Sequence, residues 1–148
     1  MSQLIGIARR SKKRAAMQEL EQTLVGEAFG VEGDLRGKPG KRQVTVLSLE
    51  SWRQACEAAG ADLPWTTRRA NFLVEGLLFD KKMVGQILSI GHVQLQITKE
   101  TVPCFRMDEA HDGLQEALAS HWRGGVCCRV LKGGQVQVGD AVHISGAA

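Results

Sequence analysis

Short runs of alternating apolar and polar residues, separated by glycine, most restrict how this 148-residue chain can fold. In the run at 92–98, Val93, Leu95 and Ile97 fall on one face of an extended chain, and polar residues alternate with them. Similar runs occur at 4–8, 43–49, 71–76, 85–90 and 126–144. The chain has 17 glycines and only 3 prolines, so turns are frequent between these runs. The pattern predicts one compact domain, 1–148, that is mostly β.

Two segments have helix-forming composition. Residues 50–59 end at Gly60, a residue suited to a left-handed helix end, and carry Cys56 on their apolar face, which predicts a core cysteine. Residues 107–122 predict a second helix, with Asp108 as its N-cap. The apolar residues of 17–25 have helical spacing, although tertiary pairing can override such a local pattern.

Composition and charge order bear on where the protein works. No segment reaches the apolar length of about 18 residues that spans a bilayer. The first positive charges follow a short apolar run, which reverses the order of a secretory signal. The four cysteines have no C-x-x-C spacing, which is typical of reduced thiols. We therefore expect a cytoplasmic protein without a membrane partner.

Basic residues are clustered although the net charge is only +3. The clusters lie at 9–14, 36–42 and 66–69, and they indicate an anionic ligand or, alternatively, a solvated surface. With no Tyr and four Phe, the chain has few surfaces on which bases could stack. A non-enzymatic β-barrel module for nucleic acid or another anionic partner is therefore kept only as the alternative function.

Cys104 follows Pro103 and precedes a predicted helix. A thiolate is a soft metal ligand and a nucleophile, so one cysteine can coordinate a metal or carry sulfur as a persulfide. Proline fixes the backbone before it, and Arg106 and the helix start favour the thiolate. The alternative is a small buried residue that packs in the core.

Five segments in order resemble the MOSC domain family, which is named for the C-terminal domain of molybdenum-cofactor sulfurases. They are VEGDLRG (31–37), KRQVTVLSLESW (41–52), TTRRANFLVEGL (66–77), VPC (102–104) and VCCRVLKGGQVQVGD (126–140). The resemblance runs from about residue 4 to residue 144 and is closest to the small stand-alone bacterial type. It implies a twisted, mostly β barrel with a few peripheral helices, and it implies that 17–25 is a strand.

The resemblance also implies a site. Cys104 matches the signature cysteine of the family, as catalytic residue and metal ligand, and Arg69 and Asn71 match an Arg-x-Asn motif that contacts the pterin or its phosphate. At a strand start these two side chains would share one side, leaving Arg68 as a surface charge. We expect Cys104, Arg69 and Asn71 to line one electropositive cleft.

The loop at 36–42 supplies further cofactor-binding candidates. Arg36, Lys41 and Arg42 can close the site, or they form a solvated loop. Many relatives carry histidine after Gly-Asp, where this chain has Leu35 and Arg36. His111 lies near the predicted helix start and is either close to Cys104 or simply exposed.

The implied function is binding of the molybdenum cofactor (molybdopterin), or sulfur carriage for it, through the Cys104 thiolate. The family context includes cofactor sulfuration and cofactor-dependent reduction of N-hydroxylated compounds. The implied partners are a pyridoxal-phosphate cysteine desulfurase or a flavin or iron–sulfur reductase. The chain lacks a cysteine-rich cluster for iron and sulfur, so oxidoreductase turnover would depend on electrons from another protein.

Overall fold

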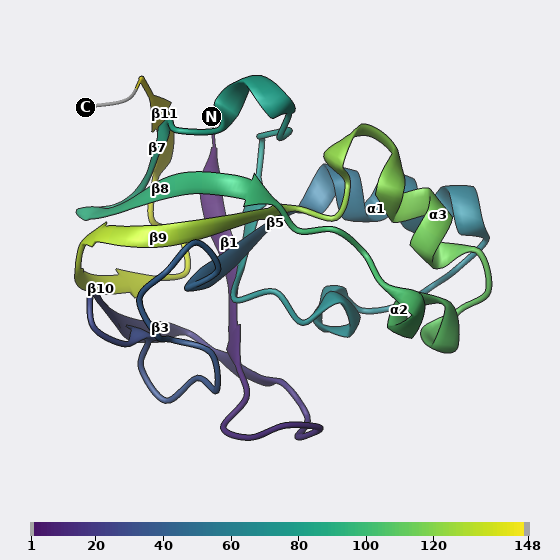
Figure 1. Ribbon diagram of the computed structural model, residues 1–148, viewed down its shortest axis with the longest axis horizontal. Helices are drawn as coiled ribbons and strands as arrows, with labels where there is room; N and C mark the ends of the chain where they lie inside the picture. Colours follow the sequence, from purple (N-terminus) through teal and green to yellow (C-terminus); the bar gives the residue numbers. More distant parts are fainter. Residues whose placement is uncertain (1, 147–148) are drawn as a thin grey trace.

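The computed structural model describes residues 2–146, and within them most regular structure is β (Figure 1). The strands are β1 Gln3–Arg9, β2 Gln18–Leu20, β3 Gln22–Gly26, β4 Gly30–Val31, β5 Val44–Ser48, β6 Phe72–Glu75, β7 Ile87–Ile90, β8 Val93–Glu100, β9 Val126–Lys132, β10 Gly134–Gln137 and β11 Val142–Ser145. The helices are α1 Leu49–Ala59, α2 Phe105–Ala110 and α3 Leu114–Ala119, with 3-10 turns η1 Trp65–Arg68, η2 Lys81–Met83 and η3 Ser120–Trp122.

The described strands form two sheets. The larger has the order β11-β7-β8-β9-β5-β6-β1-β2, in which only β5 and β6 pair in parallel, and the smaller has the order β10-β3-β4. The larger sheet curls until a single bridge joins Gln3 to Ala141, but no continuous ladder closes residues 2–146 into a barrel. The predicted mostly β class is confirmed, and the arrangement is a strongly twisted sheet.

The segment 17–25 is extended, as the family resemblance implied. β2 pairs with β1, and β3 pairs with β10 and β4. The residues of β3 alternate in burial, since Thr23 and Val25 are buried and Leu24 between them is exposed. Non-local pairing therefore overrides the helical spacing seen in the sequence.

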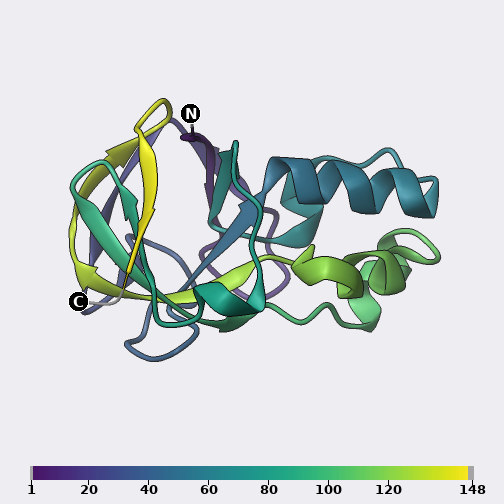
Figure 2. The ribbon, with the colours of Figure 1, turned by 90° about the horizontal axis from the view of Figure 1, so that it is seen from above.

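The core is divided between the sheet and the helices. One apolar cluster fills the space between the strands, and it includes Phe72, Leu95 and Cys128. A second cluster lies between the sheet and the helices α1 and α3, which lie side by side on one flank (Figure 2). No helix within residues 2–146 has the length and apolarity needed to cross a bilayer.

Helix α1 confirms the prediction for 50–59. The Ser48 side chain caps its first turn by accepting from the N–H of Ser51, and Gly60 ends it with φ of 69°. Cys56 is buried on its inner face. Burial of this thiol raises its pKa, as expected of a packing residue.

The prediction of one helix over 107–122 is wrong. Helix α2 begins at Phe105 with Cys104 at its N-cap, and it ends at Ala110. Gly113, with φ of 86°, separates it from α3. Asp108 is inside α2 and accepts a 2.8 Å hydrogen bond from the N–H of Gln115 in α3, so the acid joins two short helices.

Candidate functional site

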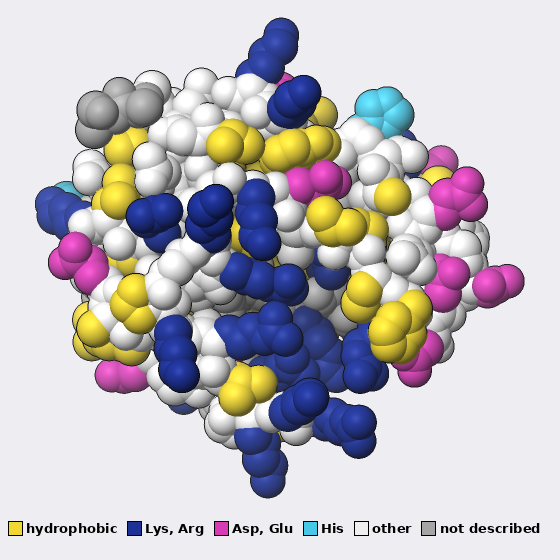
Figure 3. Space-filling view, in the orientation of Figure 1, with side chains coloured by type: hydrophobic (Ala, Val, Ile, Leu, Met, Phe, Trp, Pro, Cys, Tyr) yellow, Lys and Arg dark blue, Asp and Glu magenta, His cyan; other side chains and the backbone are white. Residues whose placement is uncertain are grey.

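A cleft of about 1000 Å³ lies between the sheet and α2. Its walls come from the loop after β1, the loops before and at the start of β5, the η1–β6 connection and the segment from Thr101 into α2. Its lining includes eight cationic side chains and two carboxylates: Arg10, Lys13, Arg14, Arg36, Arg42, Arg68, Arg69 and Arg106, with Asp34 and Glu109. Figure 3 shows these Lys and Arg side chains gathered around a hollow.

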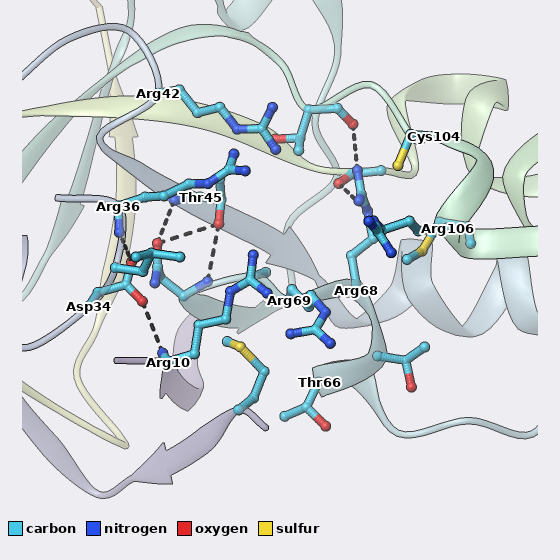
Figure 4. A pocket seen from close by; sticks show the side chains of 18 of the residues that line it. Arg10, Asp34, Arg36, Arg42, Thr45, Thr66, Arg68, Arg69, Cys104 and Arg106 are labelled. Carbon is cyan, nitrogen blue, oxygen red and sulfur yellow. Dashed lines mark hydrogen bonds between the residues drawn. The ribbon is translucent and has the colours of Figure 1, made fainter. Parts of the chain in front are cut away.

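Cys104 stands at the wall of this cleft. It is exposed, in an extended conformation with φ of −121°, and follows Pro103, whose ring is buried. Its sulfur points toward Arg68 (Figure 4). The thiol is therefore not a packing residue, and it faces a cleft lined by eight cationic side chains.

Arg68 is buried, and its prediction as a surface charge is wrong. Its side chain is 9% exposed, with Nη2 donating to the carbonyl of Thr101 at 2.7 Å and Nε donating to the carbonyl of Gly124 at 3.1 Å. Burial, and then the positive charge of Arg42, lowers the pKa of Arg68 to about 10. The prediction failed because 65–68 is a 3-10 turn and Arg69 is left-handed (φ of 62°), so strand alternation does not apply.

Arg69 and Asn71 line the cleft together with Cys104, but they differ in freedom. Arg69 is exposed, and its Nη1 donates to the carbonyl of Ala15 at 3.1 Å. Asn71 is 5% exposed, and both ends of its amide are hydrogen-bonded within the chain. Its Nδ2 donates to the carbonyl of Ala8 at 3.2 Å, and its Oδ1 accepts from the N–H of Thr45 at 3.0 Å. Asn71 thus joins β1 to β5.

The loop at 31–42 brings Arg36 and Arg42 to the cleft, whereas Lys41 is exposed and is not part of its lining. Asp34 shapes this loop, because its Oδ1 accepts from the N–H of Arg10 at 3.0 Å and its Oδ2 accepts from the N–H of Arg36 at 3.3 Å. Both oxygens of the Asp34 carboxylate therefore accept hydrogen bonds from backbone N–H groups.

Gln43 holds the same loop through its buried side-chain amide. This residue was not identified from the sequence. It is 2% exposed. Its Nε2 donates to the carbonyls of Glu27 (2.8 Å) and Gly37 (3.1 Å), and its Oε1 accepts from the N–H of Val130 at 2.8 Å. A buried glutamine between two strands has no sequence pattern that would identify it.

Arg10 is a further site residue that the sequence indicated only as part of a basic run. Partial burial, and then the charges of Arg69 and Arg36, lowers its pKa. The signal was the cluster at 9–14, of which Arg10, Lys13 and Arg14 reach the cleft. Repulsion among these cations is relieved when an anion binds.

The remaining cysteines and histidines lie elsewhere. Cys127 and Cys128 are buried in β9, and burial raises the pKa of Cys128 strongly. His111 ends α2 and is not part of the cleft lining. Across residues 2–146, no three His, Cys, Asp or Glu side chains are grouped to hold a metal ion.

The donor set of the cleft fits a large anionic ligand that carries a soft metal. Guanidinium groups form paired hydrogen bonds to phosphate oxygens, and a thiolate is a preferred ligand of soft metals. The cleft offers both along one wall, and its volume lies at the upper end for small-molecule sites.

Comparisons with known proteins point to one family. A family model described as MOSC domain matches residues 14–143. The solved structure of the YuaD protein from Bacillus subtilis superimposes with a TM-score of 0.78 at 18% identity, covering 100% of this chain and 98% of that one. YiiM from Geobacillus stearothermophilus gives 0.78 at 18% identity, covering 98% of this chain and 75% of that one.

YiiM from Escherichia coli gives a TM-score of 0.73 at 13% identity, covering 99% of this chain and 71% of that one. No curated protein matches the sequence. At these identities the solved structures show a shared fold, whereas the family match covers most of the chain.

Proposed function

Because this chain belongs to the MOSC domain family, which is associated with molybdenum-cofactor binding and sulfuration, we propose that it binds the molybdenum cofactor in the cationic cleft through Cys104. One observation carries the proposal: an exposed thiol opens onto the same cleft as eight cationic side chains. A single ligand with an anionic end and a soft metal end can contact both.

The anionic end of the cofactor is assigned to Arg10, Arg36 and Arg69, which we call the Arg10–Arg36–Arg69 group. These guanidiniums would donate to its phosphate oxygens. Arg42 contributes from the rim, and Lys41, outside the lining, adds to the positive field that attracts the ligand. Asn71 supports this site by holding β1 to β5 through both ends of its amide, and the second N–H of Nδ2 is left as a donor for the cofactor.

Cys104 would supply the protein ligand to the metal. Its extended backbone after Pro103 holds the sulfur at the cleft wall, and Arg68 lies beside it. When bound, the cofactor supplies two-electron chemistry at molybdenum. Reduction of N-hydroxylated compounds by such a site would draw electrons from a separate flavin or iron–sulfur reductase.

Sulfur carriage is the second candidate, and the exposure of Cys104 favours it. The Cys104 thiolate would attack the outer sulfur of a persulfide on a pyridoxal-phosphate cysteine desulfurase. The donor's S–S bond breaks, its thiolate leaves, and Cys104 keeps the sulfur as a persulfide. No net oxidant is needed.

Metal and sulfur analysis tests both candidates. We expect protein from a cofactor-producing host to contain molybdenum and pterin, and Cys104→Ser to lose the metal. Arg69→Ala should lose both while changing stability by no more than about half a kcal/mol, since the side chain is exposed. Cys56→Ala and Arg53→Ala, which lie outside the cleft, are the matched controls.

Intact mass after incubation with a cysteine desulfurase separates the two candidates. Metal without a persulfide adduct supports cofactor binding, and an adduct on Cys104 without metal supports sulfur carriage. Wild-type protein that acquires neither would contradict the proposed function.

A further inference from the structure

Arg68 forms no ion pair in the part of the chain that the structure describes, and Glu100, the one carboxylate that acts on its charge, does so without contact. The one ion pair found within residues 2–146 joins Arg106 to Glu109, at 3.8 Å. Arg68 is 91% buried, and its two hydrogen bonds go to backbone carbonyls. Burying a charge is costly without a counter-charge in contact, so this position favours binding of an anion from outside the chain.

Arg68 also has donor capacity left for that anion. The carbonyls of Thr101 and Gly124 use Nη2 and Nε, and no described residue bonds to Nη1. Among the side chains of residues 2–146, the only fully buried polar atom without a hydrogen-bond partner is Nε of Arg123, so Nη1 of Arg68 is not fully buried. Nη1 of Arg68 is therefore available from the cleft that the residue lines.

Among the titratable groups around Arg68, Arg42 and Cys104 act on its charge most strongly, ahead of Cys127 and Glu100. Arg42 acts on the Arg68 charge from the loop before β5, and the Cys104 thiol acts on it from the start of α2. Figure 4 shows Cys104, Arg68 and Arg106 on one side of the cleft and Arg10, Asp34 and Arg36 on the other, with Arg42 reaching in from the rim. The cleft thus has two cationic regions.

We propose that Arg68 and Arg42 form an oxyanion subsite beside Cys104, separate from the Arg10–Arg36–Arg69 group. Its ligand is a small tetrahedral oxyanion, either free or as the phosphate or sulfonate end of a substrate that reacts near the Cys104 sulfur. Planar guanidiniums recognise such groups through paired donors. The reactive role of the subsite rests on the proposed function, but anion binding at it does not.

Alkylation of Cys104 in cofactor-free protein measures occupancy of the subsite. The other three cysteines are buried, so iodoacetamide modifies Cys104 selectively in the folded protein. Inorganic sulfate should slow the reaction by a factor of 1 + [sulfate]/Kd at fixed pH, or about tenfold at a sulfate concentration about ten times Kd. Sodium chloride at equal ionic strength controls for general screening.

Three variants assign the protection to the subsite. Arg42→Gln, at an exposed position, should keep the fold and raise the sulfate Kd about tenfold or more. Arg36→Gln, in the other cationic region, should keep the protection. Arg68→Gln should abolish protection by sulfate, and circular dichroism checks that this variant folds. If Arg68→Gln does not fold, the result for Arg42→Gln decides whether the subsite exists.

Phenyl phosphate, with benzyl alcohol as its uncharged counterpart, identifies the source of the anion. Protection at lower concentration than sulfate indicates the phosphate end of a substrate, and equal protection indicates a free oxyanion. Equal alkylation rates in sulfate and chloride would overturn the proposal, as would protection unchanged in Arg42→Gln and lost in Arg36→Gln. Because no cofactor is present, these results are independent of the molybdenum measurements.

Discussion

Asn71 contributes to the site by holding the strands beneath it. Asn71→Ala leaves the N–H of Thr45 and the carbonyl of Ala8 without their partner. An unsatisfied buried group costs about 1–3 kcal/mol, so the variant should lose at least about 2 kcal/mol of unfolding free energy in urea. Gln137→Ala, at an exposed position, is the control. Equal stability of the two variants would show that the amide serves ligands instead.

Some of the site residues could be predicted from the sequence, and others could not. The local sequence left Cys104 as either a reactive thiol or a packing residue, the family resemblance favoured the reactive thiol, and its exposure argues against packing. Arg68 was placed on the surface by assuming strand alternation, and this was wrong because Arg69 is left-handed, a conformation that arginine rarely adopts. Arg10 was visible only as one member of a charge run.

Gly124, just before β9, allows the chain there to pack closely against the segment before α2. A Cβ at this position would lie 2.5 Å from the carbonyl oxygen of Thr101 and 3.1 Å from Nη2 of Arg68. Gly124→Ala should therefore cost about 1–3 kcal/mol, because backbone on one side and a buried guanidinium on the other must move. Urea unfolding measures the loss. Gly146→Ala, where a Cβ meets nothing within 4 Å, should be close to wild type, and a matching result at Gly124 would contradict this packing.

At the scale of elements, periodicity predicted the strands well and the second helix poorly. The run at 92–98 became β8, because its alternation is the pattern of a sheet with one covered face. The apolar residues at 107–122 do have helical spacing, but Gly113 interrupts the backbone between α2 and α3. The extended path of 17–25 was predicted only from the family resemblance. Its strands pair with β1 and β10, and no local pattern in 17–25 encodes that pairing.

The whole molecule carries its positive charge unevenly. The cleft takes eight of the chain's 19 Lys and Arg but only two of its 16 Asp and Glu. Pyrophosphate should therefore stabilise the folded chain, by about 2.7 kcal/mol at 100 times its Kd, which raises Tm by about 5–10 °C. Differential scanning calorimetry with chloride at matched ionic strength measures the specific part. Identical Tm values in the two salts would mean that the cleft does not bind anions specifically.

The anchoring of the 31–42 loop by Gln43 has a consequence for how this protein can diversify. Gln43 fixes the loop at Gly37 and is itself fixed to β9, and the hydroxyl of Thr98 in β8 fixes the loop again at the carbonyl of Lys41, so residues 38–40 lie between two anchors. Residues 38–41 are exposed, and a Cβ at Gly40 would meet no atom within 4 Å. Insertions here can lengthen the rim of the cleft without disturbing its floor. This stretch is where related chains can acquire new ligand preferences, and where a fluorescent reporter can be grafted beside the cleft.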